Sequence, residues 1–349
     1  MNSENKIIRR QELDELLYAM FDRLGVSRED TKMIADALIQ AELWGVTSHG
    51  LLRVEHYVRC LQSGGIKPDG AFAVEKQFGG WVSATANGGL GIPASTKATK
   101  LVIELAKQHG IAVVNLKESH HNGAEGVYAY EIAKNGMIGM VMSTGNPIMA
   151  ITGSSAMSIG NNPFAYAVPA GKYDTLMMDV AMSAVADGKV QVAKATGKML
   201  PPGCILDKDG KPSVIPDDYL NGGVLLPFGA HKGYGLAVMV EAMAGILSGA
   251  GLLHEINSWN KTPGRCGNTG HLFMAMDISK MMELSAYTAR VEEMIDSFKN
   301  AKKAEGVEEI FYPGEPELRR AAAAGDMVSL LPSTWEKLQQ GAEYVGMKI

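Results

Sequence analysis

The chain has 349 residues and a formal net charge of −5. That length fits one large domain or two domains, and 46% hydrophobic with 20% charged residues is typical of a globular protein. The acidic balance provides no basic surface for nucleic acid or for an anionic membrane, so neither partner is expected.

The cysteines and the N-terminal sequence indicate the compartment. Cys60, Cys204 and Cys266 are odd in number, far apart and without a CxxC pair, so we expect neither a disulfide framework nor a structural zinc site. The opening, MNSENKIIRRQ, lacks the apolar segment of a signal peptide. These features predict a cytoplasmic protein.

The N-terminal region is predicted to be helical. Apolar residues recur at helical spacing from Leu13 to Leu24. Ser27 then begins SRED, a cap-like start of a second helix that ends near residue 45. After the sequence GVTSHG, the segment from Leu51 to Gly65 predicts a third helix.

From about residue 70, predicted strands and helices alternate. The strands are WVSAT, IAVVNL, MIGMVMS, PFAYAVPA, DTLMMDVAMS and HLFMAMDI, and the helices between them are PASTKATKLVIELAKQHG and GAEGVYAYEIAKNG. The most apolar run, Leu236 to Leu253, contains Glu241 and ends among glycines, so we expect a buried helix and a turn. Helical periodicity returns after residue 280. We predict an α/β protein with a discontinuous helical domain, residues 1–72 with 280–349, and a central sheet domain, residues 73–279.

The sequence GLGIPA, Gly89 to Ala94, matches the loose dinucleotide pattern GxGxxA. The strand before it is weak, Pro93 stands at the helix start and no acidic residue closes the next strand, so the context of a Rossmann unit is missing. The chain also has no GxxxxGK[ST] loop, no HExxH and no other spacing that demands a metal, and we expect none.

The histidines whose contexts favour proton transfer are His49 in TSHG and the pair His120 and His121 in ESHHNGA. His121 follows a predicted strand, where α/β folds place reactive groups, and imidazole titrates near neutral pH. Arg53 lies four residues after His49, would share a helix face with it, and could bind a carboxylate through two parallel hydrogen bonds. Each residue taken alone is also compatible with a solvated loop histidine or a surface arginine.

Two further segments have the chemistry to hold a ligand. Asp179 stands in an apolar run, where a buried acid needs a partner or a proton. Lys232, in GAHKGYGL, supplies a cation among glycines at a helix start. For the segment with Lys232, the alternative is an ordinary glycine turn before a helix.

Taken together, these stretches resemble the malate/L-lactate dehydrogenase family of non-Rossmann, nicotinamide-dependent oxidoreductases. The segments SHGLLR, HHNGAEGVYAY, GMIGMVMS, IGNNPFAYAVP, MMDVAMSAVADGKV, LLPFGAHKGYGL and YPGEPE occur in the family's order and spacing. The resemblance implies a cofactor that lies on a largely antiparallel or mixed sheet, with NAD or NADP as the cofactor and NAD slightly favoured, and it implies a homodimer.

The resemblance also implies roles for individual residues. Ser48, His49 and Arg53 match the substrate-side motif, and His121 matches the family's second histidine. Some members have a serine on the cofactor where this chain has Gly145. The implied cofactor-binding residues are Thr175, Leu176, Met177, Met178, Asp179, Val180, Ala181, His231, Lys232, Gly314, Glu315 and Pro316.

The implied reaction is hydride transfer between NAD(P) and a small 2-hydroxy or 2-oxo acid such as malate, lactate or ureidoglycolate. Arg53 would fix the substrate carboxylate, and either His49 or His121 would move the proton. Reduction of a cyclic imine carboxylate is an alternative, because the same arginine could hold its carboxylate. A non-catalytic protein that binds the cofactor without turnover is the alternative from another class.

Overall fold

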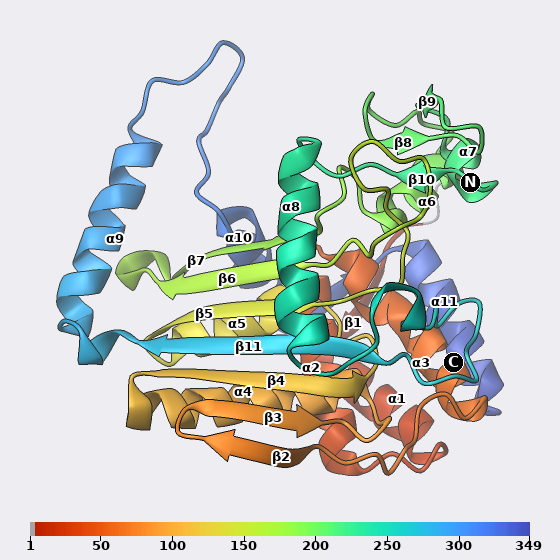
Figure 1. Cartoon of the computed structure of the whole chain (residues 1–349), viewed down its shortest axis with the longest axis horizontal. Helices are drawn as coiled ribbons and strands as arrows, with labels where there is room; N and C mark the ends of the chain where they lie inside the picture. Colours follow the sequence, from red (N-terminus) through yellow and green to blue (C-terminus); the bar gives the residue numbers. More distant parts are fainter. Residues whose placement is uncertain (1–3) are drawn as a thin grey trace.

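A seven-stranded mixed sheet forms the centre of the computed structural model, which describes residues 4–349 (Figure 1). The strand order is β2-β3-β4-β11-β5-β6-β7, and only β3 and β4 run parallel, so the predicted largely antiparallel, mixed sheet is confirmed. The strands are β2 (Ala73–Phe78), β3 (Trp81–Thr85), β4 (Ile111–Ser119), β5 (Met137–Ser143), β6 (Phe164–Pro169), β7 (Thr175–Val180) and β11 (Thr269–Asp277).

Helices cover both faces of this sheet. Helices α4 (Gly91–His109) and α5 (Glu125–Lys134) lie on one face, and α8 (His231–Val240) crosses the other (Figure 1). The sequence of β4 is almost continuously apolar because both faces of this strand are buried. Val114 and Leu116 pack with α4, whereas Val113 packs on the side of α8.

The N-terminal helices share a core with the C-terminal end of the chain. These elements are α1 (Arg10–Asp22), α2 (Arg28–Leu43), α3 (Val54–Gln62), α11 (Pro332–Tyr344) and the paired strands β1 (Lys6–Arg9) and β12 (Met327–Leu330). As the sequence predicts, Ser27 caps α2, accepting a hydrogen bond from the Asp30 amide at 3.0 Å.

The segment from 280 to 326 packs differently from the predicted helical domain. Helix α9 (Leu284–Lys299) lies against the sheet edge, where Val291 and Ile295 contact Leu176 of β7. Helix α10 (Glu315–Ala324) contacts α2 and the sheet core. Periodicity identifies a helix but not the surface that it covers, so we propose a helical unit of residues 4–72 with 327–349.

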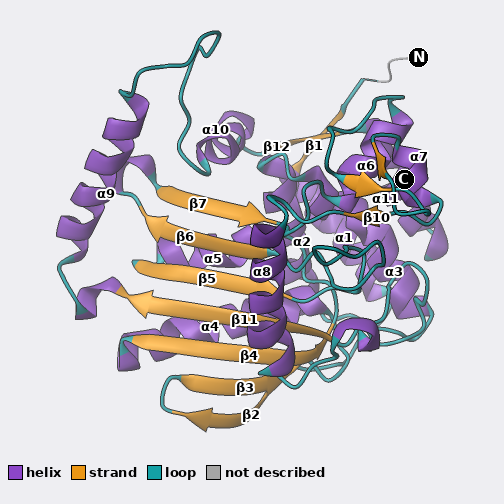
Figure 2. Cartoon of the chain, turned by 45° about the horizontal axis from the view of Figure 1, so that its top comes forward, coloured by secondary structure: helices purple, strands orange, loops and turns teal. Residues whose placement is uncertain are grey.

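Residues 148–162 and 182–230, which flank β6 and β7 in the chain, form a small lobe with its own core (Figure 2). It contains a three-stranded sheet in the order β10-β8-β9 and two short helices. The strands have only two residues each, too few to show a period in the sequence. The elements are α6 (Asp187–Ala195), β8 (Ile205–Leu206), β9 (Pro212–Ser213), α7 (Pro216–Leu220) and β10 (Val224–Leu225).

Helix α8 continues as a π-helix, η4 (Glu241–Ile246). The prediction that this apolar run is buried is wrong for its outer side. Val240 and Ala244 pack on the sheet. On the outer side the exposed fractions are 38% for Leu236, 44% for Val238, 61% for Ile246 and 57% for Leu247. Hydrophobicity alone does not say which face of a helix meets its own chain. No helix within residues 4–349 combines the length and apolar character that crossing a membrane requires.

Candidate active site

The turn that carries His49 is built on a glycine. Thr47–His49 (η1) and Leu51–Arg53 (η2) are two separate 3-10 turns, joined at Gly50, and α3 begins only at Val54. The prediction that His49 and Arg53 share one helix face is therefore wrong. Beneath the turn, the buried carboxylate of Glu42 accepts a hydrogen bond from the Leu51 amide at 3.1 Å, and burial raises the pKa of Glu42 to about 7.

The structure nevertheless brings His49 and His121 together. Their rings stack with centroids 5.5 Å apart and an interplanar angle of 18°. Nδ1 of His49 lies 2.9 Å from the Ser48 hydroxyl. Nδ1 of His121 lies 2.8 Å from the Tyr57 hydroxyl and accepts a hydrogen bond from the Gly123 amide at 3.3 Å.

Arg53 lies beside the histidine pair, and its positive charge adds to the effect of burial on the pKa of both rings. Its Nε donates to the Ser48 carbonyl at 2.6 Å. Burial, and then the positive charge of Arg53, lower the pKa of His49 to about 3. Burial, His49 and Arg53 together hold the pKa of His121 well below its usual value. Both rings are therefore neutral near pH 7. An anion bound at Arg53 would offset the positive charge that disfavours their protonation.

The small lobe reaches this site through the start of α6. A Cβ on Gly188 would lie 3.1 Å from the Ser48 Cβ, so the first turn of α6 sits against the histidine turn. The neighbouring Asp187 raises the pKa of Arg53 and thereby offsets part of the lowering that burial causes. The lobe thus contributes a carboxylate to the electrostatics of Arg53.

The residues from Thr175 to Ala181 follow the sheet edge. They form β7 and its end, and the Asp179 carboxylate accepts a hydrogen bond from the Gly126 amide, at the start of α5, at 2.8 Å. Because α5 begins just after His121 and Gly123, this end of β7 lies next to the histidine site. Burial raises the pKa of Asp179 to about 6, although the hydrogen bond from the Gly126 amide lowers it.

Gly314 and its neighbours lie against the same strand. The Met177 amide donates to the Pro313 carbonyl at 3.0 Å, and a Cβ on Gly314, which has a φ of 91°, would lie 2.5 Å from Met177 Cγ. The structure therefore joins two of the three implied cofactor segments. The hydroxyl of Thr175 is buried there without a hydrogen-bond partner among residues 4–349.

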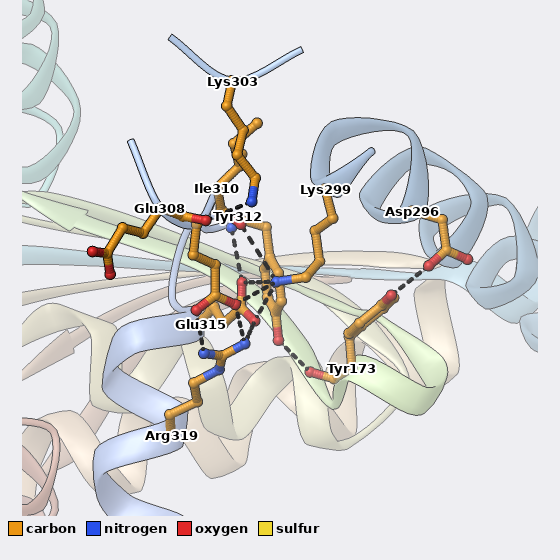
Figure 3. Close-up of polar contacts among 10 residues, drawn as sticks. Tyr173, Asp296, Lys299, Lys303, Glu308, Ile310, Tyr312, Glu315 and Arg319 are labelled. Atoms are coloured by element: carbon orange, nitrogen blue, oxygen red, sulfur yellow. Dashed lines mark hydrogen bonds and ion pairs between the residues drawn. The ribbon is translucent and has the colours of Figure 1, made fainter. Parts of the chain in front are cut away.

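Glu315 has a different environment from a ligand-facing residue. Its buried carboxylate binds Lys299 Nζ at 2.7 and 2.9 Å and Arg319 at 2.6 Å, and accepts a hydrogen bond from the Tyr312 amide at 3.2 Å (Figure 3). These contacts tie α9 to α10. Pro316, which follows, stands in the first turn of α10.

His231 and Lys232 are exposed at the start of α8, beyond the C-terminal end of β7. Gly233 brings this start close to the chain after β7, since a Cβ there would lie 2.6 Å from the Met182 carbonyl. The Ser183 hydroxyl is buried nearby with no hydrogen-bond partner in residues 4–349. An exposed histidine and lysine at a helix start fit the phosphates of a dinucleotide, and the hydroxyls of Thr175 and Ser183, unpartnered within residues 4–349, fit its riboses.

The GLGIPA turn does lie between a strand and a helix of a parallel β3-α4-β4 unit, so the expectation that this context is missing is wrong. The turn is nevertheless closed. A Cβ on Gly91 would lie 2.2 Å from the His120 carbonyl, and one on Gly89 would lie 2.2 Å from the Gly70 carbonyl. These glycines serve close packing of the chain, and no room is left for a pyrophosphate at the start of α4.

Sequence reasoning missed three residues of the site. Tyr57 lies one helical turn after Arg53, a spacing that could have revealed it. Trp259 comes from a distant loop and Asp187 from the small lobe, and no local pattern connects either with His49.

A mixed sheet next to a histidine pair and an arginine, together with the family match, identifies the chain as a non-Rossmann oxidoreductase that depends on NAD(P). The model of the malate/L-lactate dehydrogenase family matches residues 8–339. The chain belongs to this family.

Three comparisons illustrate the range of its relatives. The chain is 35% identical to malate dehydrogenase of Pyrococcus abyssi, over 88% of this chain and 86% of that protein. It is 34% identical to a Delta(1)-pyrroline-2-carboxylate/Delta(1)-piperideine-2-carboxylate reductase of Pseudomonas putida, over 82% and 83% of the two chains. The solved structure of sulfolactate dehydrogenase from Methanocaldococcus jannaschii matches 98% of each chain with a TM-score of 0.90 and 32% identity.

Proposed function

We propose that the chain transfers a hydride between NAD(P) and a small 2-hydroxy or 2-oxo carboxylic acid. The observation that carries the proposal is the stacked pair His49–His121 beside Arg53. The guanidinium binds the carboxylate with two parallel hydrogen bonds and so places the neighbouring carbon at the imidazoles.

Hydrogen bonding distinguishes the two histidines. Because Nδ1 of His121 accepts from the Gly123 amide, its proton resides on Nε2, which can donate to a substrate oxygen. Nδ1 of His49 faces the Ser48 hydroxyl, which can donate or accept. His49 can therefore alternate between two tautomers, so we assign proton transfer to His49 and polarisation of the substrate oxygen to His121.

The cofactor supplies or accepts the hydride when it is bound. We assign its binding to Thr175–Ala181 along β7, to Gly314–Pro316 beside them, and to His231 and Lys232 at the start of α8. Because the buried carboxylate of Glu315 is already paired with Lys299, Glu315 would contact the cofactor through its backbone. NAD and NADP both remain candidates, because an NADP(+)-dependent (2R)-3-sulfolactate dehydrogenase of Chromohalobacter salexigens is 34% identical to this chain.

Malate, lactate and ureidoglycolate are the substrates that we propose first. The alternative substrate is a cyclic imine carboxylate, favoured by the similarity to the pyrroline- and piperideine-carboxylate reductases. We further propose a cytoplasmic homodimer, with the exposed apolar side of α8 and η4 as the contact.

A spectrophotometric screen tests the reaction. NADH and NADPH are offered with a panel of 2-oxo acids and cyclic imine carboxylates, and NAD and NADP with 2-hydroxy acids including ureidoglycolate. Turnover of an oxo or hydroxy acid supports the proposal, and turnover of imines alone favours the alternative. Cofactor binding without turnover of any acid would favour a non-catalytic protein.

A further inference from the structure

One wall of the site is a loop that the proposed roles do not use. Residues 257–267 connect η5 (Leu253–Glu255) to β11 and return on themselves. The Asn257 amide donates to the Gly267 carbonyl at 3.0 Å, and the Asn257 side chain donates to the Cys266 carbonyl at 2.8 Å. The ends of the loop are therefore closed on one another.

This loop is also fastened to the elements around the site. The Cys60 thiol of α3 donates to the Trp259 carbonyl at 3.8 Å, and a Cβ on Gly65 would lie 2.1 Å from the Pro263 carbonyl. The Gly267 amide donates to Nε2 of His120 at 3.1 Å, next to His121. The backbone of the loop, including that of Trp259, is consequently held in place.

The side chain of Trp259 lies against both groups that would contact the substrate. The indole stacks on the His121 ring with centroids 4.2 Å apart and an angle of 20°, and the Arg53 guanidinium lies 5.1 Å from the indole centroid. His121 thus stacks with two rings, Trp259 and His49. Stacking restricts its tilt, and Tyr57 and Gly123 occupy its Nδ1, so Nε2 is the nitrogen left for a ligand.

We propose that Trp259 is a positioning residue that holds the His121 imidazole and the Arg53 guanidinium in the relative orientation that one 2-oxo acid molecule requires. The proposal rests on the proposed function, because it takes His121 and Arg53 as the groups that contact the substrate. Aromatic stacking and the cation–π contact act at the two ends of the same small ligand, its carbonyl and its carboxylate. Loss of the indole should therefore weaken substrate binding and turnover together.

The experiment compares Trp259→Phe, which keeps an aromatic face, with Trp259→Leu, which keeps an apolar side chain without one. For each, kcat and KM are measured with the oxo acid that the wild type uses best, and Kd is measured for oxamate and for the reduced cofactor. We expect Trp259→Phe to stay within about threefold of the wild type, and Trp259→Leu to lose about tenfold in oxamate affinity and in kcat/KM. The cofactor Kd should not change, since the assigned cofactor residues lie along β7 and α8.

Two results would overturn the proposal: a Trp259→Leu protein with wild-type values, or one that loses cofactor and oxamate affinity equally, which indicates general damage. If Trp259→Leu does not fold, tryptophan fluorescence provides a second test. Oxamate should change the fluorescence of the wild type but not that of Trp259→Phe. A fluorescence change in Trp259→Phe as large as in the wild type would contradict the proposal. Failure of the proposed function gives a different result, because the wild type then turns over no acid. The role of Trp259 can still be tested in that case by comparing the oxamate Kd of the wild type and the variants. A wild type that neither turns over acids nor binds oxamate overturns both.

Discussion

The carboxylate of Glu42 fills the space that a side chain at position 50 would occupy, since a Cβ on Gly50 would lie 1.9 Å from Glu42 Oε2. The same oxygen accepts the hydrogen bond from the Leu51 amide. The two residues therefore fix the turn that places His49 and Arg53. We expect Gly50→Ala to destabilise the protein by about 1–3 kcal/mol, measured by urea unfolding, and to lower kcat/KM because the turn must shift.

A double-mutant cycle isolates that contact. Glu42→Ala removes the obstructing carboxylate but leaves the Leu51 amide without its acceptor, so it destabilises the protein on its own account. In this background Gly50→Ala should cost much less than in the wild type. An equal cost in both backgrounds would show that the contact with Glu42 is not the cause.

The pH dependence of stability should reveal the buried Glu42. Its folded-state pKa, about 7, lies above the unfolded value of 4.5. The folded protein therefore retains this proton while the unfolded chain loses it, and stability falls as pH rises from about 4.5 to 7, by about 3 kcal/mol at most. The glutamine of Glu42→Gln cannot ionise. The free energy of unfolding of Glu42→Gln minus that of the wild type should therefore be larger above pH 7 than at pH 5. A constant difference across this range would contradict the assigned shift.

His49→Asn and His121→Asn should separate the roles of the two histidines. Loss of the proton-transfer group is expected to lower kcat by about 10²–10⁴-fold, and loss of a hydrogen-bond donor to the substrate oxygen by about 10²–10³-fold. Because the pKa of His49 is about 3, kcat/KM for oxidation of a hydroxy acid should stay level from about pH 5 to 8 in the wild type, and should fall only in stronger acid as His49 becomes protonated.

The pH profile of kcat provides the control. Bound carboxylate offsets the charge of Arg53, so the acid limb should lie at higher pH in kcat than in kcat/KM. His121→Asn should retain this limb and His49→Asn should lose it. The reverse pattern would exchange the two roles.

Much of the fold could be predicted from local sequence. Strands such as IAVVNL are apolar and β-branched, the helices have clear periodicity, and Ser27 with Asp30 marks a helix start. These signals act over a few residues, and the structure contains the corresponding elements at those places.

The site depended on contacts that no local pattern records. The turn at Gly50 follows from Glu42, eight positions earlier, and Trp259 reaches His121 across 138 residues of chain. The exposure of Leu247 likewise depends on tertiary packing, which decides which side of its helix is covered. Histidine and arginine could be chosen by chemistry alone, but their mutual orientation could not, because tertiary packing sets it.

Glu315→Gln tests whether that residue is structural. Its carboxylate binds Lys299 and Arg319, which are themselves partly or half exposed. Neutralising it should cost about 2 kcal/mol in the free energy of unfolding, less at high salt, while the cofactor Kd stays within about twofold. Glu317→Gln is the matched control, since its contact with Arg320 is only a 3.8 Å ion pair at the surface, and it should cost less than 0.5 kcal/mol, roughly. A large loss of cofactor affinity in Glu315→Gln alone would place its carboxylate on the cofactor.

Substitution of Ile246, on the outer side of η4, and of Leu247, the next residue, tests the proposed dimer. Ile246 and Leu247 are 61% and 57% exposed in the single chain, and Leu236 and Val238 of the same helical run are 38% and 44% exposed. Exposed apolar side chains gathered on one element are typical of a protein–protein contact. Light scattering should give twice the mass of one chain for the wild type and the single mass for Ile246→Lys with Leu247→Lys, because a buried lysine has no partner in a twofold contact with its own copy. Phe78→Lys is the control, since Phe78 is 86% exposed at the turn between β2 and β3 and should leave the mass unchanged. A wild type that scatters as one chain would remove the dimer, and dissociation by Phe78→Lys alone would move the contact to the other end of the sheet.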